Sequence, residues 1–202
     1  MDRQEAEFQF SFRFPLTTGD LLVHGDGVDI AYTQLSYWQV YSSQFAPFRE
    51  TNYAPELFYT MPLGLHPRGA DTAMRIGLEH QSNGRGTNAD ATLSRSWNRL
   101  YAQYFYAKDN YVVAVRPWYR IPESAKTSPT DPGGDDNPDI EKYLGHFDLT
   151  GALRYRNLEF SLLARASLRG SNNYGAIELG MSFPLRHRIR GFVQYFNGTA
   201  TV

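Results

Sequence analysis

The feature that most constrains this chain is a strict alternation of apolar and polar residues. Residues 7–14 read Glu-Phe-Gln-Phe-Ser-Phe-Arg-Phe, which places Phe8, Phe10, Phe12 and Phe14 on one face and the polar side chains on the other. A period of two residues is typical of a β-strand that lies between an apolar and a polar environment. We therefore expect a strand here with one apolar face.

The same alternation recurs along the chain. It is clearest in residues 74–79, 99–106, 143–154, 158–167 and 177–183. We count about ten such segments of roughly 9–14 residues, whereas the average strand of a soluble protein has about 5–6. A tilted strand of about 9–11 residues can span a bilayer.

The sequence therefore predicts an all-β fold, an antiparallel transmembrane β-barrel of which about ten strands are visible. The charged faces need a polar interior, and the apolar faces are too many for one soluble core, so a closed barrel with lipid outside satisfies both. A soluble antiparallel barrel or sandwich is the alternative that alternation leaves open. No internal boundary is visible, so residues 1–202 are expected to form a single domain.

The lengths of the connections support a barrel with two different ends. Long connections fall near 41–52, 83–94 and 122–139, and short ones near 66–71, 107–110 and 155–157. Long and short connections alternate, as they do when one end of a barrel carries extended loops and the other carries tight turns.

Composition excludes several classes of protein. A formal net charge of −1 argues against a strongly basic nucleic-acid binder. The absence of cysteine excludes a disulfide framework and a cysteine-based metal or redox site. No run approaches the roughly 18 apolar residues of a membrane helix, so strands are the expected way of crossing a membrane.

Three polar residues interrupt the apolar faces. His80 and Ser82 continue the apolar face of the 74–79 segment, about 6–7 Å apart at two strand residues. Asn98 continues the apolar face of the next segment, and a hairpin would bring it beside His80. An imidazole next to a hydroxyl is the nucleophile and base arrangement of acyl transfer. Strand ends at the membrane interface are the alternative, because polar side chains are harmless there.

Gln34 is a second anomaly. If Ile30 and Tyr32 face outward, so does Gln34, and an amide in hydrocarbon needs a polar partner such as a second protomer. The opposite phase or a bulge is the alternative, because Ala31 and Leu35 are apolar too.

Longer strings around these residues resemble the outer-membrane phospholipase A family, nearly from end to end. The strings are Pro47-Phe-Arg-Glu-Thr-Asn-Tyr53, His80-Gln-Ser-Asn-Gly-Arg85, Ser94-Arg-Ser-Trp-Asn-Arg-Leu-Tyr101, Arg116-Pro-Trp-Tyr119, Asp135-Asp-Asn-Pro-Asp-Ile140 and Tyr174-Gly-Ala-Ile-Glu-Leu-Gly180. The resemblance implies a serine-type, calcium-dependent hydrolase of the acyl esters of phospholipids and lysophospholipids, activated by dimerisation. It also implies a multi-pass protein of the Gram-negative outer membrane, with its active site at the outer-leaflet side.

The resemblance also implies roles for individual residues. Ser82 would be the nucleophile, His80 the general base and Asn98 the residue that orients the base. The backbone N–H of Gly84 and a calcium-bound water would hold the oxyanion. The implied calcium ligands are the Arg85 carbonyl, Ser94 and Asp136, and the implied dimer contact is Gln34. Oxygen donors of this kind suit a hard cation such as calcium.

The chain departs from the family at three places. The loop 86–93 is longer, and Phe45 stands where the family has the partner protomer's calcium-binding serine, although Ser42 or Ser43 could replace it. The resemblance implies a family barrel of about twelve strands, so we expect this chain to lack the first and last of them. The alternative functions are a non-enzymatic outer-membrane barrel, such as a small pore or structural protein, and a soluble lipid-binding barrel.

Overall fold

A computed structural model describes residues 5–39, 48–84, 94–128, 131, 133–167, 174–186 and 188–198. The strands are β1 (Glu5–Pro15), β2 (Gly27–Gln39), β3 (Phe48–Pro62), β4 (Asp71–Ser82), β5 (Ser96–Lys108), β6 (Tyr111–Arg120), β7 (Phe147–Tyr155), β8 (Leu158–Ala166), β9 (Gly175–Arg186) and β10 (Ile189–Gly198). Two short helices complete the described elements, the 3₁₀ turn η1 (Pro67–Gly69) and α1 (Ile140–Leu144). Among the described residues, no helix is long and apolar enough to cross a lipid bilayer.

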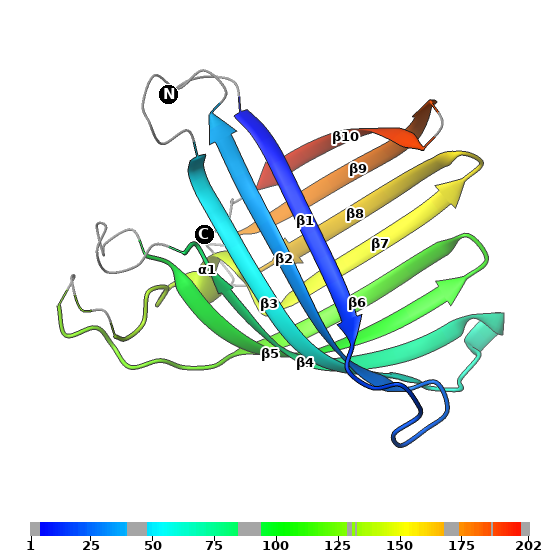
Figure 1. Ribbon diagram of the computed structural model, residues 1–202, viewed down its shortest axis with the longest axis horizontal. Helices are drawn as coiled ribbons and strands as arrows, with labels where there is room; N and C mark the ends of the chain where they lie inside the picture. Colours follow the sequence, from blue (N-terminus) through cyan, green and yellow to red (C-terminus); the bar gives the residue numbers. More distant parts are fainter. Residues whose placement is uncertain are drawn as a thin grey trace.

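The strands form one antiparallel sheet of ten strands in the order of the sequence, which confirms the predicted all-β antiparallel fold. The sheet curls round so that β1 and β10 approach the same side of the molecule (Figure 1). In the described part of the chain, each of these two strands is paired on one side only.

The outer face of the sheet is apolar, as the alternation predicts. Phe10, Phe12 and Phe14 of β1 are all more than half exposed, and Ile76 and Leu78 of β4 are almost half exposed. Large apolar side chains in such numbers on one surface need a non-aqueous neighbour.

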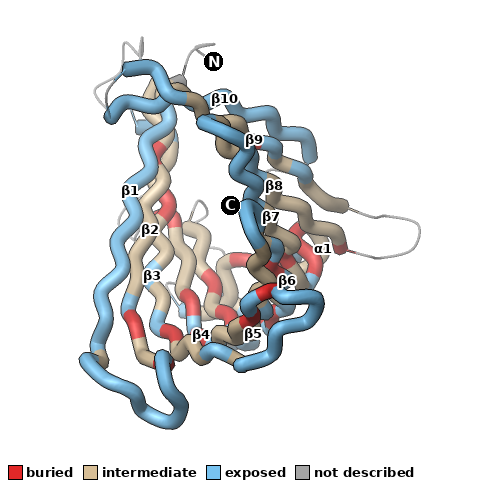
Figure 2. Tube along the Cα trace, turned by 90° about the vertical axis from the view of Figure 1, so that its right-hand side faces the viewer, coloured by how far each residue is buried: buried red, intermediate tan, exposed pale blue. Residues whose placement is uncertain are grey.

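The inner face carries aromatic and charged side chains. Many of the buried positions lie in β4, β5, β6 and α1 (Figure 2). The buried cluster consists of Phe58, Trp97, Tyr101, Trp118, Ile140 and Leu144. Gly77 of β4 lies where a Cβ would collide with the ring of Tyr101. The missing side chain leaves room for this ring to pass across β4, and its hydroxyl donates to Glu56 of β3 at 2.8 Å.

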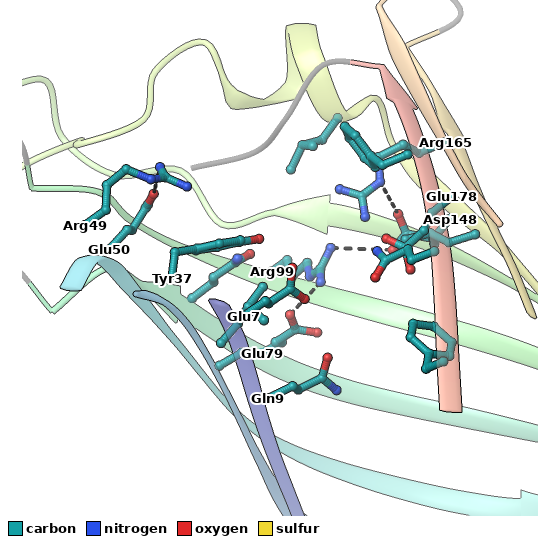
Figure 3. Close-up of a pocket in the computed structure, with 18 residues that line it drawn as sticks. Glu7, Gln9, Tyr37, Arg49, Glu50, Glu79, Arg99, Asp148, Arg165 and Glu178 are labelled. Atoms are coloured by element: carbon teal, nitrogen blue, oxygen red, sulfur yellow. Dashed lines mark hydrogen bonds and ion pairs between the residues drawn. The ribbon is translucent and has the colours of Figure 1, made fainter. Parts of the chain in front are cut away.

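A charged network crosses the interior beside this cluster. Glu79 accepts hydrogen bonds from Arg99 at 2.5 Å and Arg116 at 3.1 Å. Asp148 accepts from Arg116 at 2.6 Å and lies 3.7 Å from Arg99 and 3.8 Å from Arg165. The network borders a cavity of about 920 Å³ whose walls carry charges of both signs (Figure 3). Buried charges persist when they are paired in this way.

The connections lie at the two ends of the sheet, but two details of the prediction are wrong. Residues 48–52, expected in a long connection, belong to β3, and the long connection 16–26 lies at the same end as the tight turns. Tight turns at 109–110 and 156–157 lie at one end, and residues 83–84 and 94–95 lie at the other, together with the described part of the connection between β6 and β7 (Figure 1). The segment 121–146 carries α1, whose Ile140 and Leu144 pack into the interior. The sequence pattern assigned Tyr143 to a strand, which is wrong, because this residue lies in α1.

Candidate functional site

The centre of the candidate site is a side-chain pair at the loop-bearing ends of β4 and β5. His80 lies directly opposite Asn98 in the ladder between the two strands. The Nδ1 atom of His80 and the Oδ1 atom of Asn98 are hydrogen-bonded at 2.8 Å. An amide oxygen only accepts hydrogen bonds, so Nδ1 carries the proton and Nε2 carries the lone pair.

The strand period puts these side chains on the apolar outer face. His80 and Ser82 follow the exposed Ile76 and Leu78 at intervals of two residues, and Asn98 precedes the exposed Leu100 by two. The three polar side chains are half-buried. Among the described residues, no hydrogen bond joins the hydroxyl of Ser82 to the ring of His80.

Gly84 follows Ser82 closely and has a backbone that only glycine adopts easily. Its φ is +63°, and a Cβ at this position would overlap the ring of Tyr53. Just before it, Asn83 closes the ends of the loop, because its N–H donates to the Arg95 carbonyl at 2.9 Å and its Oδ1 accepts from the Arg95 N–H at 3.0 Å. The backbone of Gly84 is thereby held beside the candidate nucleophile.

Oxygen atoms converge next to this loop. The Oδ2 atom of Asp136 accepts hydrogen bonds from the hydroxyls of Ser94 at 2.9 Å and Ser96 at 3.1 Å. Its Oδ1 atom forms an ion pair with the ammonium group of Lys126. Burial alone would raise the pKa of Asp136, but the hydrogen bonds from Lys126, Ser94 and Ser96 lower it, so the carboxylate is ionised.

This donor set fits a hard divalent cation. A carboxylate and two hydroxyls are oxygen ligands of the kind that calcium takes. The ion pair with Lys126 shows that the carboxylate of Asp136 has a positive charge beside it. Within the residues that the structure describes, no group of three or more His, Asp or Glu side chains could hold a metal ion, here or elsewhere, so this candidate site consists of one carboxylate and hydroxyl oxygens. The third ligand implied by the sequence, Arg85, lies outside the described residues, as do Phe45, Ser42 and Ser43.

Gln34 lies on the outer face of the sheet, as expected if Ile30 and Tyr32 face outward. It pairs with Phe10 of β1, whose ring is exposed on that face. Its Oε1 atom accepts a hydrogen bond from the Tyr32 hydroxyl at 2.9 Å, and its Nε2 atom donates to Ser36 at 3.3 Å. The amide thus has partners within its own chain and keeps hydrogen-bonding capacity for another.

A polar row connects Gln34 to the centre of the site. Gln34 lies opposite Tyr53, Tyr53 lies opposite Ser82, and Ser82 lies opposite Ser96. Residues opposite each other on one face of a sheet are direct neighbours. The candidate dimer contact and the candidate nucleophile are therefore separated by a single tyrosine.

Comparison with known proteins assigns the chain to a family. The model of the phospholipase A1 family matches residues 1–201. The chain belongs to the phospholipase A1 family. It is 38% identical over 200 residues to phospholipase A1 of Klebsiella pneumoniae, covering 97% of this chain, and 37% identical to that of Escherichia coli. The chain spans 63% of the length of these two relatives.

Solved structures of phospholipase A1 relatives share the fold. The outer membrane phospholipase A of Escherichia coli superimposes with a TM-score of 0.81 at 35% identity, covering 96% of this chain and 75% of that one. A Salmonella typhi outer membrane phospholipase, solved as a dimer with bound calcium, has a TM-score of 0.81 at 36% identity and the same coverage of this chain, with 70% of its own. The curled antiparallel sheet is thus the barrel fold of these proteins.

Several residues of the candidate site were not identified from the sequence. Ser96 shares the phase of Asn98 and lies opposite Ser82, so the alternation could have identified it. Tyr53 lies within one of the quoted strings, but its contact with the glycine loop depends on the register. Glu123 and Lys126 come from a loop without periodicity, and no sequence signal indicates their partners.

Proposed function

We propose that this chain carries the active site of a calcium-dependent outer-membrane phospholipase that hydrolyses acyl esters of phospholipids and lysophospholipids. The observation that carries this proposal is the His80–Asn98 hydrogen bond of 2.8 Å, on the apolar outer face and two residues from Ser82. A base fixed in one tautomer beside a hydroxyl is the arrangement that nucleophilic catalysis needs.

The proposed reaction begins with attack of Ser82 Oγ on the acyl carbonyl carbon, while the hydroxyl proton passes to Nε2 of His80. His80 then gives this proton to the glycerol oxygen, which leaves with the lysophospholipid. Water attacks the acyl-serine ester next, losing a proton to His80, and release of the fatty acid returns that proton to Ser82. Asn98 holds the ring through its Nδ1 proton throughout, as an aspartate does in related triads, but without a formal charge.

Gly84 would stabilise the developing oxyanion with its backbone N–H, which the turn holds after Ser82. Calcium, when bound, would add Lewis-acid stabilisation of the same negative charge. Ser94, Ser96 and Asp136 would hold the ion, together with the Arg85 carbonyl that the family resemblance implies.

The outer-face location suits a membrane substrate. A phospholipid in the bilayer reaches Ser82 sideways, without entering the interior of the sheet, and its acyl chain can lie along the exposed apolar side chains of β4 and β5. We assign the site to the outer-leaflet side of a Gram-negative outer membrane.

Dimerisation is the proposed means of activation. The remaining hydrogen-bonding capacity of Gln34 can serve a second copy of the chain, and the polar row through Tyr53 leads from that contact to Ser82. The Salmonella typhi relative was solved as a dimer with bound calcium, which supports this assignment.

The test is calcium-titrated release of fatty acid from phospholipid micelles by the refolded chain. The proposal predicts release that rises with calcium and is lost in Ser82→Ala, with Ser11→Ala as a control at an exposed serine on the opposite face of the sheet. A folded barrel that releases no fatty acid, yet conducts ions across a planar bilayer, would support the pore alternative instead.

A further inference from the structure

The amide of Asn98 is held from both sides. Its Oδ1 atom accepts the hydrogen bond from His80, and its Nδ2 atom donates to the Oε1 atom of Glu123 at 2.8 Å. Glu123 comes from the segment that follows β6, 25 residues further along the chain. The carboxylate is half-buried against the site.

The backbone fixes Glu123 in this place. Ile121, two residues earlier, donates its N–H to the carbonyl of Asn98 at 2.9 Å, so the segment binds both the backbone and the side chain of the same residue. Pro122 between them restricts the backbone further. The chain is also held at the residue after Glu123, because the Ser124 carbonyl accepts a hydrogen bond from the N–H of Asp135 at 2.8 Å.

The contact with Glu123 determines which end of the Asn98 amide faces His80. An asparagine can present either its oxygen or its NH₂ group to a histidine, and the two choices demand opposite tautomers of the ring. With the NH₂ group toward Nδ1, the proton would move to Nε2, which then could not accept a proton from Ser82. A carboxylate only accepts hydrogen bonds, so Glu123 binds the NH₂ group and leaves the oxygen for His80.

We propose that Glu123 is a positioning residue of this site, which fixes the amide of Asn98 and thereby the tautomer of His80 that acts as base. The inference rests on the proposed function. It adds Glu123, as a fourth and positioning residue, to the proposed catalytic residues Ser82, His80 and Asn98. Because the bond is charge-assisted, it also polarises the amide toward the ring.

Fatty-acid release from phospholipid micelles at saturating calcium tests the proposal in three variants. In Glu123→Ala, kcat is expected to fall about tenfold while KM stays unchanged. A tenfold preference for one orientation of the amide is what one hydrogen bond to a charged group supplies. Glu123→Gln retains an acceptor oxygen and is expected to stay within about twofold of the parent chain. Ser124→Ala, at the exposed neighbouring position, is the matched control.

A spectroscopic measurement separates positioning from a general structural effect. In ¹⁵N-histidine-labelled protein, with the signal assigned through His80→Asn, the parent chain and Glu123→Gln are expected to show a protonated Nδ1. Glu123→Ala is expected to show a mixture of both tautomers. This readout needs no turnover, so it tests the role of Glu123 even if the chain hydrolyses no lipid.

A double-mutant cycle completes the test. In an Asn98→Asp background there is no amide to orient, so adding Glu123→Ala should cause no further loss of kcat. The proposal is overturned if Glu123→Ala keeps the parent tautomer, or if Glu123→Gln loses as much activity as Glu123→Ala.

Discussion

The ammonium group of Lys126 lies against the carboxylate of Asp136, on the side opposite the hydroxyls of Ser94 and Ser96. A calcium ion held by these oxygens would have to share Asp136 with this lysine or displace it. Lys126→Met is therefore expected to raise calcium affinity about fivefold, since a partly exposed ion pair is worth about 1 kcal/mol.

Calorimetric titration of the detergent-solubilised chain with calcium chloride measures this affinity. Lys108→Met is the control, because Lys108 is a half-buried lysine that donates to the Arg68 carbonyl at the end of the sheet with the tight turns. An unchanged or weaker affinity in Lys126→Met would contradict the assignment of Asp136 as a calcium ligand.

The turn at Gly84 is expected to tolerate no side chain. In Gly84→Ala the new methyl group meets the ring of Tyr53, and the positive φ adds strain of order 1 kcal/mol. We expect fatty-acid release to fall at least tenfold, because the N–H group moves away from the oxyanion. Gly19→Ala, where a Cβ would meet nothing within 4 Å, should behave as the parent chain. Removing the clash in a Tyr53→Ala, Gly84→Ala double variant should restore part of the activity, and no recovery would count against the steric explanation.

The interior network predicts a large effect at Asp148. This carboxylate is buried and faces Arg116, Arg99 and Arg165. Asp148→Ala removes the ion-pair partner of Arg165 and leaves Arg99 and Arg116 to share the single carboxylate of Glu79. The free energy of unfolding in urea should fall by about 3–5 kcal/mol. Asp71→Ala, at a carboxylate that is 88% exposed, should change it little. A loss below about 1 kcal/mol for Asp148→Ala would mean that the network does not stabilise the sheet.

The connection between β1 and β2 predicts a pH dependence of stability. Burial alone would raise the pKa of Asp26, but hydrogen bonds from the Tyr59 hydroxyl and from the N–H groups of Leu21, Val23 and Leu22 hold it well below the ordinary value of 3.8. A lowered folded-state pKa contributes stability that is fully present above pH 3.8 and is lost as the pH falls toward the folded-state value.

The pH dependence can be measured as the free energy of unfolding of the parent chain and of Asp26→Asn between pH 6 and pH 2.5. The variant is expected to lose less stability over this range, because its side chain does not titrate. Parallel curves would show that Asp26 makes no such contribution.

The outer-face placement of the site follows from the sequence because strand side chains alternate. Ile76 and Leu78 define the apolar face of β4, so His80, two residues after Leu78, must lie on that face. The same reasoning places Asn98 on the apolar face of β5, two residues before Leu100. A hairpin then brings the two polar residues into one row. Gln34 was ambiguous, because apolar residues lie in both phases of its strand, and its pairing with Phe10 resolves the ambiguity.

The loop contacts could not be predicted in the same way. Glu123 and Lys126 meet Asn98 and Asp136 only because the segment after β6 folds back across the end of the sheet. The same connection carries α1, whose five residues are too few to show a helical period, so Tyr143 was assigned to a strand. The dimer and the calcium site stay predictions that rest on the family.

The most direct test of the central claim is covalent labelling of Ser82. The refolded chain would be incubated in detergent micelles with a long-chain alkyl sulfonyl fluoride, with calcium or with a chelator, and analysed by peptide mass spectrometry. We predict one sulfonyl adduct, on Ser82, that requires calcium and is lost in His80→Ala. A folded chain that stays unlabelled with calcium present, or that is labelled equally well without His80, would contradict the proposed site.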